Sequence, residues 1–195
     1  MNTEKWNMTN YLTKIYQYEG KYRKTAAYVF LALTIRWGVA EAYRIPSESM
    51  NPTLKPGDFI IVNKAQYGVR VPFTKTWLFE TGPVVRGDVV VFRYPKDEST
   101  FYVKRVVGLP GDQVFISQDG QVFVNGLLQN EDHTAKKISF TTNTLNPYGP
   151  VIVPADNLLV LGDNRDNSSD SRVWGFVPKN ELMGKVAFKF FSWVD

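Results

Sequence analysis

Two serines stand two residues apart in the segment RIPSESMNPTLKPGD, which covers residues 44–58. Ser47 and Ser49 follow a short apolar run and lie among prolines and a glycine, which favour turns. A serine hydroxyl becomes an effective nucleophile only when a neighbouring base removes its proton. The segment therefore predicts either an ordinary turn that carries hydroxyl groups or the nucleophilic part of a hydrolytic site.

A nucleophilic serine would need a base from elsewhere in the chain. The only histidine, His133, lies in the polar stretch NEDHT, which predicts a solvated loop and not a Ser-His-Asp triad. Lys104 lies in FYVKRVVGLPGD, with apolar residues on both sides, where burial could lower its pKa enough to leave the amine neutral. In a strand, Lys104 and Arg105 would point to opposite faces. The other interpretation is a lysine at a sheet edge that discourages aggregation.

A third polar stretch is LGDNRDNSSDSRVWG, at residues 161–175, directly after an apolar segment. Its side chains can close turns by hydrogen bonds to the backbone, so a surface loop is one interpretation. Asp170 and Arg172 are two residues apart and could pair on one face if the segment is extended. The acids lack the spacing of a calcium-binding EF-hand loop, so we expect no metal site here.

Composition excludes several classes of site and partner. The 195 residues suffice for one or two small domains, and without cysteine there are no disulfides, thiolate metal ligands or cysteine nucleophiles. The net charge of +4 arises within residues 1–45, because the other 150 residues hold 16 basic and 16 acidic side chains. The basic surplus therefore suggests a membrane flank and not a nucleic-acid-binding domain.

Three interpretations fit the N-terminal segment. The apolar run after the basic residues 21–24 is interrupted by Arg36. It could be a removable signal peptide, with AEA at residues 40–42 as its cleavage site, or a buried core helix. It could also be a membrane anchor over residues 25–43, which as a helix would span about 28 Å, close to one hydrocarbon core. In that case the basic cluster places the N-terminus in the cytoplasm.

The rest of the chain predicts a mostly β fold of several sheets or a partial barrel, because short β-branched and aromatic segments alternate with turn residues. The predicted strands are residues 59–64, 88–95, 101–108, 113–117, 121–125, 151–154, 157–163 and 184–191.

Three details modify this expected β fold. Turns are expected at Asp119-Gly120 and at Asn125-Gly126, and residues 117–150 look like a polar insertion or lobe. The aromatic residues of segment 71–80 suit either core packing or a surface that rests on a bilayer.

The motifs PSESMNPTL, RGDVVVFRYP, YVKRVVGLPGD and GDNRDNSSDSRVWG occur in the order found in type I signal peptidases, and the chain resembles that family from about residue 20 onward. The resemblance implies a membrane-anchored serine endopeptidase that removes signal peptides from exported proteins on the outer face of the plasma membrane. It favours the anchor interpretation: a cytoplasmic segment at 1–24, a single transmembrane helix at 25–43 and an extracytoplasmic catalytic domain at 44–195.

The resemblance also assigns roles to individual residues. Ser49 matches the nucleophile of the family and Lys104 matches its general base. Ser47 matches the hydroxyl that, with the Ser49 backbone N–H, binds the oxyanion. Ser168 matches the serine that orients the lysine.

Other matches concern the surroundings of this dyad. Asp170 and Arg172 match a pair that supports the loop, and Asp163 is expected to meet Arg105. One departure is Glu48, which stands where the family commonly has glycine. Its side chain must point away from the substrate, and it would raise the pKa of the lysine if it came close.

The expected partners follow from the same resemblance. The substrates are signal peptides of exported preproteins, with small side chains at the first and third positions before the cut. Residues 45–50 and 88–95 are the expected walls of shallow pockets for them. Membrane lipid is the other partner; no metal, organic cofactor or nucleic acid is expected, and the chain is expected to be a monomer.

Two alternative functions stay open from the sequence. A related Ser/Lys maturation protease could serve a conjugation or secretion system, and a catalytically inactive, membrane-anchored module could bind exported chains. A self-cleaving repressor fits less well, because it would carry a DNA-binding helical module and no membrane span.

Overall fold

The computed structural model describes residues 22–29, 39–71, 74, 76–118, 120–132, 134 and 147–191. The chain divides into two compact units, Met1–Val39 and Ala40–Asp195. In the first unit, residues 22–29 are helical and exposed. Among the described residues, no helix combines the length and the apolar character that a membrane crossing requires.

The predicted anchor is wrong at its C-terminal end. Residues 40–43 belong to strand β1 (Ala40–Arg44), which pairs antiparallel with β2 (Phe59–Asn63). Pairing with this apolar strand overrides the local helical interpretation of the sequence, as tertiary context commonly does. Residues 30–38, the centre of the predicted anchor, lie outside the described residues.

The second unit is built on a seven-stranded sheet in which all neighbours are antiparallel. The sheet is open, because β1 and β12 end the order. Its strands in spatial order are β1, β2, β13 (Leu182–Phe191), β5 (Val89–Tyr94), β6 (Asp97–Gly108), β11 (Asn157–Leu161) and β12 (Val177–Pro178).

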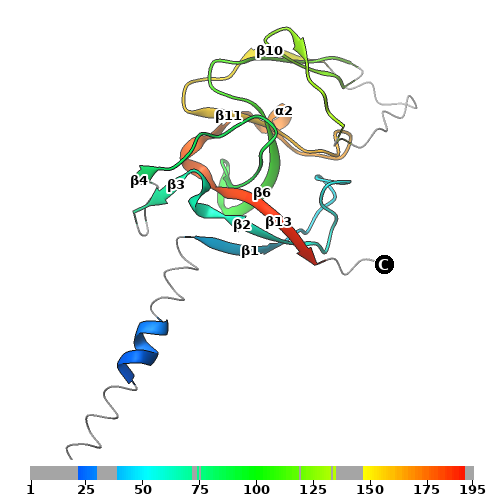
Figure 1. Ribbon diagram of the computed structural model, residues 1–195. Helices are drawn as coiled ribbons and strands as arrows, with labels where there is room; N and C mark the ends of the chain where they lie inside the picture. The colour runs from blue at the N-terminus through cyan, green and yellow to red at the C-terminus, as the bar shows by residue number, and fades with distance from the viewer. Residues whose placement is uncertain are drawn as a thin grey trace, which may run out of the picture. The chain divides into compact units, whose positions relative to one another are not determined.

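Smaller elements complete this unit. A four-stranded sheet has the order β10 (Tyr148–Ile152), β7 (Gln113–Ile116), β8 (Val122–Val124) and β9 (Leu127–Leu128), and it overlaps the predicted lobe at residues 117–150 without matching its bounds. Figure 1 shows β10 on the far side of β11 and α2 (Ser171–Trp174) from β1 and β2. A hairpin of β3 (Gly68–Arg70) and β4 (Trp77–Glu80) and the short 3-10 helices Lys64–Gln66 and Lys179–Glu181 complete the list. A mostly β fold with several sheets is thus confirmed.

The predicted turns and the aromatic segment have mixed outcomes. Asn125 and Gly126 both have positive φ, 53° and 79°, as the expected tight hairpin requires, whereas Asp119 lies outside the described residues. In β4, Leu78 and Phe79 are 63% and 52% exposed, so core packing does not explain them. Trp77 packs partly against the core.

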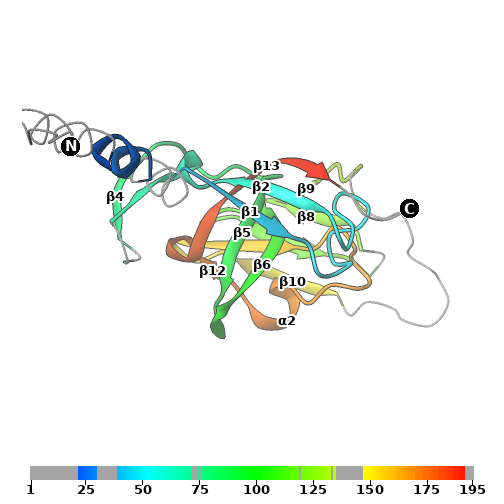
Figure 2. The same ribbon diagram turned by 90° about the horizontal axis from the view of Figure 1, so that it is seen from below.

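Strand β6 is longer than predicted and has two different halves. Its residues pair with β5 from Asp97 to Arg105, but β11 pairs with it only between Arg105 and Gly108. Figure 2 shows β5 and β6 running together beyond the other strands. Within the described residues, the outer side of β6 before Arg105 therefore has no strand partner.

Candidate active site

The two serines lie in a turn whose ends are fixed in the core. Ile45 and Met50 are buried in a cluster with side chains of β2 and β5. The Ile45 N–H donates to the Asp58 carbonyl at 2.8 Å, and the Gly57 N–H donates to the Ile45 carbonyl at 2.8 Å. Residues 46–49, which we call the serine turn, are thereby held at the surface between two buried anchors.

Strand β6 brings Lys104 to the serine turn. Its Nζ donates a hydrogen bond of 2.6 Å to Ser49 Oγ and one of 3.1 Å to the Val103 carbonyl. Lys104 is only 4% exposed, and its Nζ lies 5.4 Å from the centre of the Tyr102 ring. A lysine that discourages aggregation at a sheet edge would have to present its charge to solvent, so that alternative is wrong: this amine is enclosed and faces a hydroxyl.

Burial changes the acid–base behaviour of this lysine. Desolvation lowers the pKa of Lys104 from its ordinary value of 10.5 to about 8, although the nearby carboxylates of Asp170 and Asp163 oppose the shift. An amine with such a pKa is partly neutral at physiological pH and can accept a proton. The pair can therefore work as an activated nucleophile and its base.

Ser47 adds a second hydroxyl to the site. Its Oγ lies 3.3 Å from Ser49 Oγ and is exposed. Within the described part of the chain, the Ser49 backbone N–H donates no hydrogen bond. Both groups predicted to bind the oxyanion thus lie beside Ser49 Oγ.

Residues 162–170, here called the GDN loop, hold the serine turn from the other side. The Asn164 N–H donates to the Ser49 carbonyl at 3.1 Å, and its side-chain Nδ2 donates to the Glu48 carbonyl at 3.2 Å. A side chain at Gly162 would overlap Ser168 Oγ and the Ser49 carbonyl, since its Cβ would lie 2.2 and 2.5 Å from them. Sequence reasoning missed Asn164; its place in the polar motif was the only available signal.

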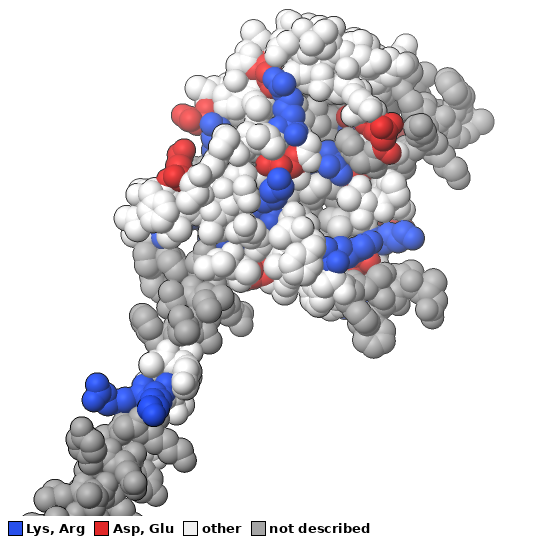
Figure 3. Space-filling view, in the orientation of Figure 1, with Lys and Arg blue, Asp and Glu red and all other residues white. Residues whose placement is uncertain are grey.

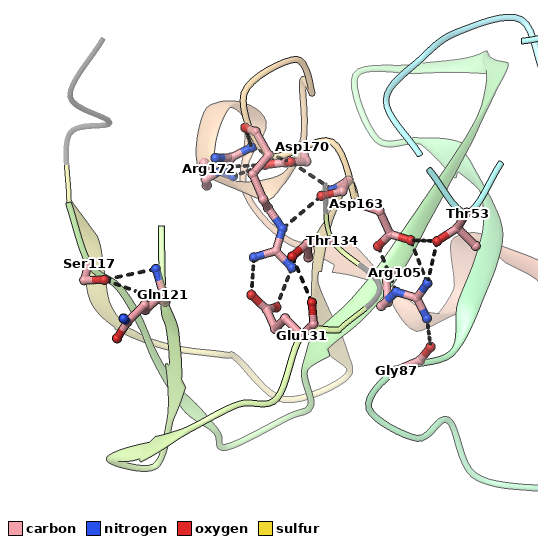
Figure 4. A network of polar contacts seen from close by, with 12 residues as sticks. Thr53, Gly87, Arg105, Ser117, Gln121, Glu131, Thr134, Asp163, Asp170 and Arg172 are labelled. Carbon is pink, nitrogen blue, oxygen red and sulfur yellow. Dashed lines mark hydrogen bonds and ion pairs between the residues drawn. The ribbon is translucent and has the colours of Figure 1, made fainter. Parts of the chain in front are cut away.

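Two ion pairs stabilise the GDN loop, as predicted, and Figure 4 shows both. Arg105 binds Asp163 in a bidentate manner at 2.8 and 2.6 Å, and Thr53 Oγ1 donates to the same carboxylate at 2.5 Å. Arg172 contacts Asp170 at 2.9 Å through two of its nitrogens. Asp170 also accepts from the Gly162 N–H at 3.0 Å, so this buried carboxylate joins the two ends of the loop.

Ser168 does not make its predicted contact in this structure. Its Oγ is buried and has no hydrogen-bond partner among the described residues, so it does not bond to Lys104. It does lie against Gly162 and beside the serine turn. An orienting role for Ser168 therefore stays a prediction.

The serines open into a cleft of about 450 Å³. One wall is the predicted segment Ile45–Met50, but the other is Thr100–Lys104 of β6, with Asn167 and Ser169 at the rim. The prediction that residues 88–95 form a wall is wrong. None of these residues lines the cleft; most lie in β5, which pairs with β13 along one edge and with β6 along the other.

The acidic side chain between the serines does not reach the lysine. Glu48 is exposed, and the carboxylates that act on the pKa of Lys104 are Asp170 and Asp163.

In the described residues, no group of His, Asp and Glu could hold a metal ion. His133 lies outside them, and Figure 3 shows both signs of charge interspersed over the visible face of the second unit.

Comparison with known proteins agrees with this geometry. The family model described as signal peptidase, peptidase S26 matches residues 21–193. The signal peptidase I of Pseudomonas fluorescens is 40% identical, over 86% of this chain and 70% of the relative. That of Pseudomonas aeruginosa is 37% identical over the same shares, and the probable signal peptidase I-2 of a Synechocystis species is 43% identical over 88% and 71%. The chain therefore belongs to the signal peptidase family, peptidase S26, and is a serine endopeptidase of the signal peptidase I type.

Proposed function

We propose that this chain cleaves the signal peptides of exported preproteins with Ser49 as nucleophile and Lys104 as general base. The observation that carries the proposal is the 2.6 Å contact between Ser49 Oγ and the buried Lys104 Nζ. Neutral Lys104 takes the Ser49 proton as Oγ attacks the scissile carbonyl, and the resulting ammonium protonates the leaving amine. Water then hydrolyses the ester on Ser49, with Lys104 again accepting a proton. The cycle uses no metal or organic cofactor.

The nucleophile is tested with purified protein and unrelated preproteins. Ser49→Ala should fold normally and release no mature protein, whereas the wild type should release several, each with small residues at the first and third positions before the cut. N-terminal sequencing of the products checks the cleavage sites. Cleavage by Ser49→Ala would refute the assignment, and cleavage of a single preprotein would favour the dedicated maturation protease.

The oxyanion of the tetrahedral intermediate is proposed to bind the Ser49 N–H and the Ser47 hydroxyl, which lie next to the nucleophile. Ser47→Ala should lower kcat by about 10²–10³, because one oxyanion donor is typically worth that factor. KM should change little, since the bond forms only in the transition state. Steady-state kinetics on a peptide substrate provide the measurement. An effect on KM alone would remove Ser47 from this role.

Substrates are proposed to bind in extended form along the free side of β6, which forms one wall of the cleft. A strand added there would use backbone hydrogen bonds for affinity and place alternate side chains into the cleft.

The N-terminal unit is proposed to anchor the enzyme, with the catalytic unit on the outer face of the membrane and the exposed Leu78 and Phe79 on the bilayer. Deleting residues 1–39 leaves β1 intact, so the shortened enzyme should remain active on a peptide but bind lipid vesicles much more weakly. Vesicle sedimentation of both forms provides the comparison. Equal sedimentation would show that the N-terminal unit is no anchor.

A further inference from the structure

The four-stranded sheet is joined to the GDN loop by an ion pair that the sequence did not suggest. Glu131, which follows β9, binds the guanidinium of Arg165 through both carboxylate oxygens: Nη1 lies 2.7 Å from Oε2, and Nη2 contacts Oε1. The side chains are only 7% exposed for Arg165 and 15% for Glu131. The Thr134 N–H and Oγ1 both donate to the Glu131 carbonyl at 2.9 Å, so the acid lies in an ordered turn (Figure 4).

The third nitrogen of the same guanidinium binds within the GDN loop, next to the serine turn. Arg165 Nε donates to the Gly162 carbonyl at 3.0 Å, and the Arg165 carbonyl accepts from Arg172 Nη2 at 2.7 Å. Gly162 lies against the Ser49 carbonyl, which also accepts from the Asn164 N–H. A shift of Arg165 would therefore move the part of the loop that touches the nucleophilic residue.

We propose that Glu131 is a positioning residue for the peptidase reaction, which acts through Arg165 on the GDN loop and so keeps Ser49 within reach of Lys104. A bidentate ion pair fixes the direction of a guanidinium. The net contribution of such a pair to the free energy of unfolding is small, because the desolvation of the two charges offsets their attraction. Glu131 lies outside the cleft lining and touches no reacting atom. The proposal rests on the dyad of Ser49 and Lys104.

The test compares the intact chain with Glu131→Gln, which keeps the shape of the side chain and removes its charge. We expect kcat to fall by roughly ten- to a hundredfold, since small displacements of reacting groups have effects of this size, with little change in KM. The matched control is Asp112→Asn, which breaks another bidentate pair, with Arg86 at 2.9 and 2.5 Å, away from the cleft. It should lower the melting temperature but leave kcat unchanged.

A second set of variants keeps the test decisive if Glu131→Gln folds poorly. Arg165→Met and Glu131→Gln/Arg165→Met leave no unpaired buried cation. If Glu131 acts through Arg165, the double variant should have the same kcat as Arg165→Met alone. Additive losses of kcat, or a Glu131→Gln enzyme with wild-type kcat and only a lower melting temperature, would overturn the proposal. Activity in Ser49→Ala would instead refute the dyad, so the two failures are distinguishable.

Discussion

Lys104→Met should abolish preprotein cleavage and at the same time make the folded protein more stable at neutral pH. Without a base next to Ser49 Oγ, the loss of kcat should be on the order of 10⁴ to 10⁶, as for other nucleophile–base pairs. Lys64→Met, which removes a lysine that pairs with Glu41 and does not line the cleft, is the matched control and should keep full activity. A Lys104→Met enzyme with normal turnover would end the dyad hypothesis.

The stability gain follows from the pKa of Lys104. It is about 8 in the folded protein and ordinarily 10.5. Below pH 8 the amine is charged in both states, but its charge is buried in the folded state and solvated in the unfolded state, which destabilises the folded protein. The penalty is at most about 3 kcal/mol, declines as the pH rises from 8 to 10.5, and is absent above that range. Denaturant unfolding of wild type and Lys104→Met at pH 7 and pH 10.5 measures this difference. A gain that does not shrink at high pH would exclude charge burial as its cause.

The same pKa predicts the pH profile of the wild type. If Lys104 is the general base, as proposed, only its neutral amine is active, so kcat/KM should rise with pH and level off above a midpoint near 8.

Arg105→Met should lower the free energy of unfolding more than the substitution of an exposed residue on the protein surface would. Asp163 is fully buried, and Arg105 supplies two hydrogen bonds to its carboxylate. Removing one partner of a buried pair typically lowers the free energy of unfolding by about 3–5 kcal/mol, because the other charge stays in a poorly solvating site. Chemical denaturation at pH 7 is the measurement.

The control for this prediction removes both charges. Arg105→Met/Asp163→Leu should recover much of the lost stability, since apolar side chains can replace a buried pair. Activity should remain low, because Asp163 belongs to the loop that holds the serine turn. If the double variant is as unstable as Arg105→Met, uncompensated charge is not the cause of the loss.

Much of the fold could be predicted because each central strand has a local signature. The segments around β2, β5, β7 and β11 are short, β-branched and bounded by turn residues, and their predicted positions are confirmed to within about two residues. β1 was missed because its small residues follow an apolar run and look like the end of a helix. Only its partner β2, distant in sequence, makes it a strand.

The site divides in the same way. Ser49, Lys104 and the two ion pairs lie in dense motifs, where residue type and spacing made them candidates and the family resemblance assigned their roles. The contact of Glu131 with Arg165 joins residues 34 positions apart through a separate sheet, and no local pattern signals it. The wrong prediction that residues 88–95 form a cleft wall has a similar cause. The order of strands in the sheet decides which strand borders the cleft, and β5 lies between β13 and β6.

The edge of β6 that has no strand partner in the described part of the chain has a consequence for which proteins this enzyme could process. Backbone amide and carbonyl groups are the same in every polypeptide, so a peptidase that binds its substrates by backbone hydrogen bonds tolerates wide variation in their sequences. The same mode of binding requires that the backbone amides of the substrate are not already hydrogen-bonded within the substrate's own fold. Folded domains would therefore resist cleavage without any need for sequence recognition, and only segments that are still unfolded during export would be cleaved.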